Sequence, residues 1–92
     1  MTKIVIKKLV WDEHNVEHIK KHKVTVSEVE DLARNIAAHK KAKKGRYLII
    51  GRVGARILSV VMNRKGLGIY YPASSRDSDK KERRILYEKE KI

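Results

Sequence analysis

The hydrophobic pattern of the first residues predicts a strand. Residues 3–10 are rich in β-branched side chains and are too few to form a stable helix, so we expect an extended segment that ends near Trp11. The alternation of apolar and polar positions is interrupted at Lys7-Lys8. An edge strand with a bulge explains both this interruption and the two lysines.

Two helical patterns follow. Asp12 offers an N-terminal acceptor for a helix that ends near His22-Lys23, with its inner face formed by Val16, Ile19 and the stems of Lys20 or Lys23. The second helix begins at a capping box of Thr25 and Glu28. It continues with apolar residues at helical spacing, which are Val29, Leu32, Ala33, Ile36 and Ala37, and Val24 with Val29 forms its hydrophobic staple.

The second half of the chain reads as an antiparallel meander. Residues 39–45 predict a basic loop, with a short strand at 36–40 before it as an open alternative. Residues 47–50 and 57–62 predict two strands joined through Gly54-Ala55, with Gly51 as a candidate bulge. Because residues 57–62 are apolar on both faces, that strand is expected to lie centrally.

A turn at residues 63–66 is expected to lead into a strand at 68–71, with Pro72 at an edge position or at the strand end. Small residues at 73–75 then predict a turn into a charged helix over about 78–90, preceded by Asp77 and Asp79. Ile85 and Leu86 are the only strong apolar pair of this helix. We therefore expect it to be weakly anchored, on the rim of the sheet or on a partner.

This order of elements predicts an α+β fold, in which an antiparallel sheet carries two N-terminal helices on one face and a C-terminal helix follows. No repeat or linker divides the chain, so residues 1–92 are expected to form a single domain. The chain has no cysteine and no apolar run long enough to span a membrane. We expect a cytoplasmic protein without membrane contact.

The charge points to polyanionic partners. The chain has 23 Lys and Arg against 11 Asp and Glu, a formal net charge of +12, and such a balance favours binding to phosphate backbones. Five arginines lie on or beside the predicted strands, where they are compatible with a basic sheet face or with ordinary solvated alternation: Arg46, Arg52, Arg56, Arg64 and Arg76. Aromatic residues that could stack on bases are Trp11, Tyr47, Tyr70 and Tyr71, although Trp11 is expected to pack in the core.

Three histidines share one side of the first predicted helix. His14, His18 and His22 are spaced by four residues, and neighbouring pairs at that spacing can chelate a metal. No HExxH element is present, so we expect no metal and no cofactor. A role of one histidine toward nucleic acid is the favoured alternative.

Metal-independent cleavage of RNA needs a base for the ribose 2′-hydroxyl, an acid for the leaving oxygen and cations for the phosphate. His22, Tyr87 and the Lys and Arg side chains offer these groups, although a histidine at a helix C-terminus also serves as a partner of the helix dipole. Arg76 can hold a phosphate or pair with Asp77, Asp79 or Glu82. Glu82 and Arg83 are open to the same two interpretations.

The chain resembles the BrnT-type toxins of bacterial and archaeal toxin–antitoxin modules. The resemblance rests on the order and spacing of these pieces: Trp11-Asp12-Glu13 with Asn15, His18-Ile19, Lys21-His22, Val24 leading to Glu28-Val29-Glu30, Arg46-Tyr47, Ile50-Gly51, the strand from Leu58 to Met62, Ser75-Arg76, Glu82-Arg83 and Tyr87.

This resemblance implies a RelE-like fold and a metal-independent ribonuclease that inhibits translation until a cognate antitoxin binds it in a heteromeric complex. A homodimer is left open. The implied site residues, together with the strand arginines, give catalytic candidates His22, Arg76, Glu82 and Tyr87 and RNA-binding candidates Lys21, Arg46, Arg52, Arg56 and Arg83. Lys23 stands where the family commonly has a helix-ending glycine, which predicts a less sharp turn after His22.

A second interpretation is an RNA- or ribosome-binding basic module without catalysis. A third is a protein that binds only an acidic protein segment through its charge. Salt-sensitive binding of intact RNA distinguishes the second from a ribonuclease, because phosphate contacts make affinity fall steeply with salt.

Overall fold

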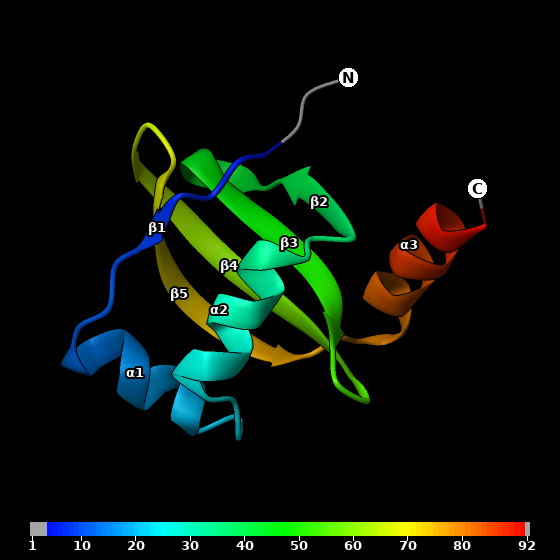
Figure 1. Ribbon diagram of the computed structural model, residues 1–92, viewed down its shortest axis with the longest axis horizontal. Coiled ribbons are helices and arrows are strands. Elements are labelled where there is room, and N and C mark those ends of the chain that lie inside the picture. The colour runs from blue at the N-terminus through cyan, green and yellow to red at the C-terminus, as the bar shows by residue number, and fades with distance from the viewer. Residues whose placement is uncertain (1–3, 92) are drawn as a thin grey trace.

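The computed structural model describes residues 4–91 and shows a five-stranded sheet with helices on both faces (Figure 1). The elements in chain order are β1 (Lys8–Leu9), α1 (Glu13–Lys20), α2 (Val26–Arg34), β2 (Ala38–Lys41), the 3-10 turn η1 (Lys43–Gly45), β3 (Arg46–Val53), β4 (Arg56–Gly66), β5 (Ile69–Asp77) and α3 (Lys80–Glu90). The strand order is β1-β5-β4-β3-β2. The predicted α+β class is confirmed, and β4 is central as expected.

The first strand is much shorter than residues 3–10 predicted. Only Lys8–Leu9 pairs, and it pairs in parallel with Ile69–Tyr70, so the sheet is antiparallel everywhere except at this edge. The amides of Lys7 and Lys8 both donate to the Gly68 carbonyl, at 2.8 and 3.1 Å. This shared acceptor explains the interrupted alternation, because it adds a residue without extending the ladder. Residue 3 lies outside the described part of the chain.

A buried asparagine fixes the start of α1. Asp12 and Asn15 form a reciprocal capping box, and the Asn15 side-chain amide donates to the Val10 carbonyl at 2.9 Å. Asn15 and Ile19 are the buried residues of α1. The expected inner face was therefore wrong in part, since Val16 is half-buried and the lysines are exposed. A polar side chain takes the inner position because its hydrogen bonds close the preceding loop.

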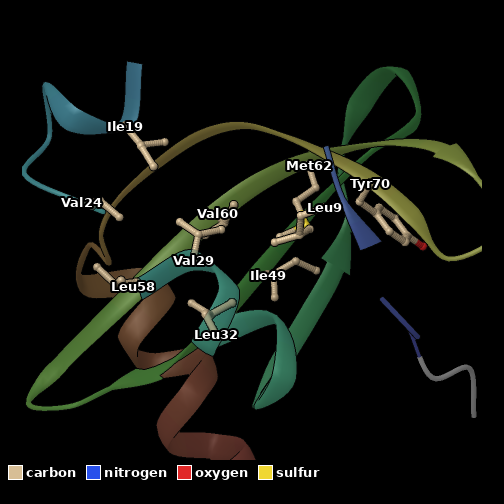
Figure 2. Close-up of a cluster of buried hydrophobic side chains, with 10 residues drawn as sticks. All are labelled: Leu9, Ile19, Val24, Val29, Leu32, Ile49, Leu58, Val60, Met62 and Tyr70. Carbon is tan, nitrogen blue, oxygen red and sulfur yellow. The ribbon is translucent and has the colours of Figure 1, made fainter. Parts of the chain in front are cut away.

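The main core lies between α1, α2 and one face of the sheet. α2 begins at the predicted capping box of Thr25 and Glu28, and its apolar face packs on β3 and β4. Figure 2 shows this cluster, which consists of Leu9, Ile19, Val24, Val29, Leu32, Ile49, Leu58, Val60, Met62 and Tyr70. Trp11 packs against it, as expected, and donates its indole N–H to Glu30 at 2.8 Å.

Gly51 pairs regularly with Leu58, so the predicted bulge at this position is wrong. A Cβ at Gly51 would lie 3.0 Å from the Asn35 carbonyl oxygen and 3.4 Å from the Leu32 side chain. The glycine is there because the end of α2 approaches the strand closely. The irregular positions are instead in the pairing of β4 with β5, between Val61 and Met62 and between Arg64 and Gly66.

β5 is longer than residues 68–71 predicted and continues through the expected small-residue turn to Asp77. Pro72 thus lies inside the strand, next to the register shift and beyond the two residues that pair with β1. Its missing N–H costs little there because the outer side of β5 no longer carries a ladder. Similarly, β4 runs through the predicted turn at 63–66, and β2 with η1 occupies most of the predicted basic loop.

The second face of the sheet is partly covered by α3, which lies on the right in Figure 1, away from α1 and α2. Leu86 is fully buried against Ile50 and Ala38, with Leu48, Ile57 and Ile85 beside them. Such a small apolar contact confirms that α3 has few hydrophobic anchors. No helix within residues 4–91 is long and apolar enough to cross a membrane.

Lys23 adopts a backbone conformation that favours glycine. Its φ is 58°, in the left-handed region, and the Val24 amide still bonds the Ile19 carbonyl at 3.1 Å. The turn after His22 is therefore as sharp as a glycine would make it, and the prediction of a less sharp turn was wrong. The chain tolerates a strained residue here because the following valine is held in the core.

We expect Lys23→Gly to stabilise the fold by about 1 kcal/mol, since it removes the left-handed strain of a residue with a Cβ and adds only a smaller loss of chain entropy. Urea denaturation measures the change in the free energy of unfolding. Lys21→Gly is the matched control, because Lys21 has φ −60°, and it should destabilise the fold by about 0.5–1 kcal/mol. Equal effects of both substitutions would contradict the strain.

Candidate functional site

Arg76 and Glu82 form the central ion pair of the corner where β5 leads into α3. The guanidinium Nη1 and Nη2 donate to the two carboxylate oxygens at 2.7 and 2.8 Å. The Glu82 side chain is 9% exposed, and that of Arg76 is 46% exposed. The pair thus has a buried acidic end and a basic end that solvent reaches. The sequence left open whether Arg76 holds a phosphate or pairs with a nearby carboxylate, and the structure shows the pair with Glu82.

The carboxylate of Glu82 has further donors. The Asp79 amide and the Ser59 hydroxyl both donate to its Oε1 at 2.9 Å, and Ser59 lies 2.7 Å from the Ser78 hydroxyl. Asp79 accepts in return from the Glu82 amide, which completes a capping box at the start of α3. One carboxylate therefore caps the helix, holds Arg76 and ties both to the middle of β4.

These contacts decide the charge of Glu82. Burial opposes its ionisation, but the hydrogen bonds from Arg76, the Asp79 amide and Ser59 outweigh burial, and the pKa of Glu82 is lowered. The hydrogen bond to Glu82 in turn raises the pKa of Arg76. Both groups remain charged at neutral pH, and neither is adjusted toward proton exchange there.

Three more candidates lie on α3 or beside it. Tyr87 is 46% exposed, and the Arg52 guanidinium lies 6.0 Å from the centre of its ring. Arg52 also pairs with Glu90 through two bonds of 2.7 and 3.0 Å, while Arg83 donates to the Ser78 carbonyl at 3.0 Å. Five candidates are thus on α3 or on the sheet face that α3 covers: Arg52, Arg76, Glu82, Arg83 and Tyr87.

Arg56 lies on the opposite face. Its Nη1 donates to both oxygens of Glu28, at 3.0 and 2.9 Å, and to the Lys23 carbonyl at 2.9 Å. Its Nε donates to Asp77 at 3.1 Å. Arg56 therefore joins the turn after α1 to the end of β5. An uninterrupted basic face of all five strand arginines is excluded, because Arg56 and Arg64 alternate with the residues that face α3.

His22 and Lys21 are exposed at the C-terminal end of α1. The His22 ring lies 5.8 Å from that of His18, which lies 6.5 Å from that of His14. Within residues 4–91, no hydrogen bond or ion pair joins His22 to Arg76, and no group of three His, Cys, Asp or Glu side chains is arranged to hold a metal. The link between the two candidates is indirect, through Lys23, Arg56 and Asp77.

Arg46 lies at the far end of the sheet, where it pairs with Asn63, well along the strands from the Ser59–Arg76 pair. Of the nine candidates, three are at the corner of β5 and α3, Arg76, Glu82 and Arg83, and two form a separate group with Glu90 further along α3, Arg52 and Tyr87. The remaining four lie outside both groups: Arg46, Arg56, Lys21 and His22. The sequence analysis missed Ser59 and Ser78, which connect Glu82 to the sheet. Ser59 is the one polar residue in the apolar run from Ile57 to Met62, and that isolation was its signal.

The arrangement is that of a small α+β toxin fold. The structure matches the crystal structure of the ribonuclease toxin BrnT of Brucella abortus with a TM-score of 0.64 and 25% sequence identity, over 79% of this chain and 97% of that one. No protein-family model matches the sequence, and no curated protein matches it. The resemblance to BrnT that the sequence suggested is thereby confirmed in the structure, and the fold is BrnT-like.

We expect Glu82→Gln to lower the free energy of unfolding at pH 7 by about 1–3 kcal/mol, because it removes a charged, buried hydrogen-bonding partner. A carboxylate whose pKa is lowered by folding stabilises the fold above its unfolded pKa of about 4.3 and loses that effect as the pH falls through the lower, folded pKa. The difference between wild type and variant should therefore shrink in acid below that unfolded value.

Denaturation at a series of pH values measures this difference. Glu88→Gln is the control, since it removes the same charge from α3 at a side chain that is 63% exposed, and should change stability by less than about 0.5 kcal/mol. A wild-type to Glu82→Gln difference that stays constant through the acid range would contradict this account of the ion pair.

Proposed function

We propose that this chain is a ribonuclease toxin of a toxin–antitoxin module, which cleaves RNA without a metal, inhibits translation and is neutralised by a cognate antitoxin. The observation that supports this most is the structural match to BrnT, which extends over 97% of that ribonuclease toxin. The net charge of +12 agrees with an RNA substrate. The whole of residues 1–92 would act as one domain in the cytoplasm.

In this proposal Arg76 binds the phosphate at the cleavage point. Its guanidinium is held by Glu82 and is exposed enough to meet a ligand, and a planar fork of donors suits phosphate oxygens. Glu82 acts as a positioning residue, because its oxygens already accept bonds from Arg76, Ser59 and Asp79. The sequence analysis named Glu82 as a catalytic candidate without a defined role.

Tyr87 is the proposed proton donor to the leaving oxygen. It is the exposed aromatic residue of α3, and the nearby Arg52 would neutralise a phosphate beside it. Arg83 extends the same basic surface. His22 is the proposed base for the 2′-hydroxyl, and this role requires the RNA to pass around the end of β5, where Arg56 joins Asp77 to the turn that follows His22. Lys21 would then contact the backbone next to His22.

The antitoxin would form a heteromeric complex that covers the corner around Arg76. An acidic segment is the expected chemistry of its contact, since this chain is strongly basic. α3 is the element most easily reshaped by such a partner, because Leu86 is its only fully buried apolar anchor among the described residues. A homodimer is compatible with the proposal but has no further support.

A second candidate function is an RNA- or ribosome-binding module without catalysis. The engagement of both Glu82 oxygens favours it, because this carboxylate is then not available as a base. In this case RNA would bind in a salt-sensitive manner and stay intact.

We expect Arg76→Lys to reduce RNA cleavage by about 100- to 1,000-fold, because lysine keeps the charge but loses the two-pronged contact with the phosphate. Cleavage of single-stranded RNA is measured in EDTA with purified protein, alongside growth arrest on expression. Arg76→Ala should abolish cleavage, but it also leaves Glu82 buried without its cation, so circular dichroism must show that it is folded.

Arg84→Gln is the control, since Arg84 is an exposed residue of α3 outside the proposed site, and its cleavage rate should stay within about threefold of wild type. Folded wild-type protein that leaves RNA intact at neutral pH would refute the ribonuclease. Retained affinity for that RNA would then support the second candidate.

A further inference from the structure

A second basic surface lies at the end of the sheet opposite the Arg76 corner. A cavity of about 670 Å³ is formed between the N-terminal segment, β2, the start of β3 and the hairpin of β4 and β5. Figure 1 shows this hairpin at the upper left, whereas the junction of β5 and α3 is at the lower right. The proposed ribonuclease site makes no use of this cavity.

The cavity is basic, and its lining in the described part of the chain includes no carboxylate. Its charged lining residues are Lys40, Lys41 and Arg64, with His39 beside them. Lys41 pairs across the ladder with Tyr47, and Arg64 with Tyr70, so these two cations are on the cavity side of the sheet. Within residues 4–91 neither has an acidic partner, and Arg64 donates only to the Gly66 carbonyl at 3.3 Å. Such cations attract an anion.

The same cavity is lined by aromatic and apolar surface. Tyr47 and Tyr70 meet edge to face, with ring centres 5.8 Å apart. Leu67 is 80% exposed and Val5 is 59% exposed. With Tyr87, these are the only large hydrophobic residues that are exposed in the described part of the chain, and two of the three border one cavity. Inorganic phosphate could contact the cations of the cavity but not its aromatic and apolar lining.

We propose that this cavity binds a nucleotide of single-stranded RNA, with the base against Tyr47 and Leu67 and the phosphate between Lys41 and Arg64. Unpaired nucleotides combine a flat apolar face with a charged backbone, which is the pairing of surfaces found here. The inference rests on the proposed function for its substrate class. It adds a binding site remote from the cleavage point.

The position of the cavity determines what it contributes to the reaction. Tyr47 lies on the face of the sheet that carries the main core, and Arg76 lies on the face that α3 covers. A nucleotide in the cavity would therefore lie on the opposite face of the sheet from the scissile phosphate, and further along β4, since Tyr47 pairs with Met62 and Arg76 with Ser59. Its loss should raise KM for long RNA and leave kcat unchanged, because the contact is equal in the ground and transition states.

The test measures binding of a 2′-O-methyl RNA oligonucleotide, whose blocked hydroxyl prevents cleavage, by fluorescence anisotropy. The double variant Lys41→Gln with Arg64→Gln should bind about tenfold more weakly, and the salt dependence of log K should become less steep by about 0.7, the value for one phosphate contact to a single strand. Lys43→Gln with Lys44→Gln is the matched control, because it removes the same charge beside β2 from residues that do not line the cavity. It should weaken binding less than threefold.

A second pair of variants tests the stacking surface. Tyr47→Phe keeps the ring and should bind RNA as wild type does, whereas Tyr47→Leu should bind about tenfold more weakly. Thermal denaturation shows whether each is folded. Nuclear magnetic resonance gives an independent measurement, since the oligonucleotide should shift the amide signals of Tyr47 and Gly68 in the wild-type protein.

Equal weakening by the cavity pair and the control pair, or no shift at Tyr47 and Gly68 on saturation with RNA, would overturn this site. If an acidic peptide shifts the amide signals of Tyr47 and Gly68 and RNA does not, the cavity binds a protein partner and the RNA site is overturned. If RNA shifts the cavity signals but stays intact, only the ribonuclease activity is refuted. If the double variant Lys41→Gln with Arg64→Gln cleaves RNA with the KM of wild type, only the cavity site is refuted.

Discussion

The buried carboxylate of Glu82 is the interaction on which the C-terminal part of this protein depends. An ionised side chain that is 9% exposed must be neutralised where it lies. Arg76 supplies the charge, and Ser59 and the Asp79 amide supply the remaining donors. Because these three come from β5, β4 and the start of α3, one side chain sets the position of the helix on the sheet. The hydrophobic contact of Leu86 alone would leave the direction of α3 poorly fixed.

The sheet separates two kinds of packing. On one face, α1 and α2 cover an apolar cluster that runs from Leu58 to Tyr70 (Figure 2). On the other, α3 covers a smaller apolar cluster and a group of charged pairs. The main core and the Arg76–Glu82 ion pair therefore lie on different faces of the sheet, so the charged residues around α3 can change without disturbing that core. Arg56 lies on the same face as the main core, where it joins Asp77 at the end of β5 to the Lys23 carbonyl after α1.

The sequence allowed the fold class, the start of α2 and the central place of β4 to be predicted, since each depends on local pattern. It did not show that β1 is only two residues long, because the apolar run at 4–6 meets the core without joining the ladder. It offered Asp77, Asp79 and Glu82 as partners of Arg76 but did not choose among them, because the choice depends on β5 continuing through Ser74 and Ser75 to the start of α3. Arg56 was grouped with Arg52, and only the strand register separates them by face.

The parallel pairing of Lys8–Leu9 with Ile69–Tyr70 joins the two ends of the sequence into one sheet. A chain made from its N-terminus therefore cannot close this edge of the sheet until residues 69–70 have left the ribosome, and cannot pair Arg76 with Glu82 until residue 82 has followed. Until then the segment around Lys8–Leu9 has no strand to pair with, so the edge of the sheet and the Arg76 corner both form late in folding.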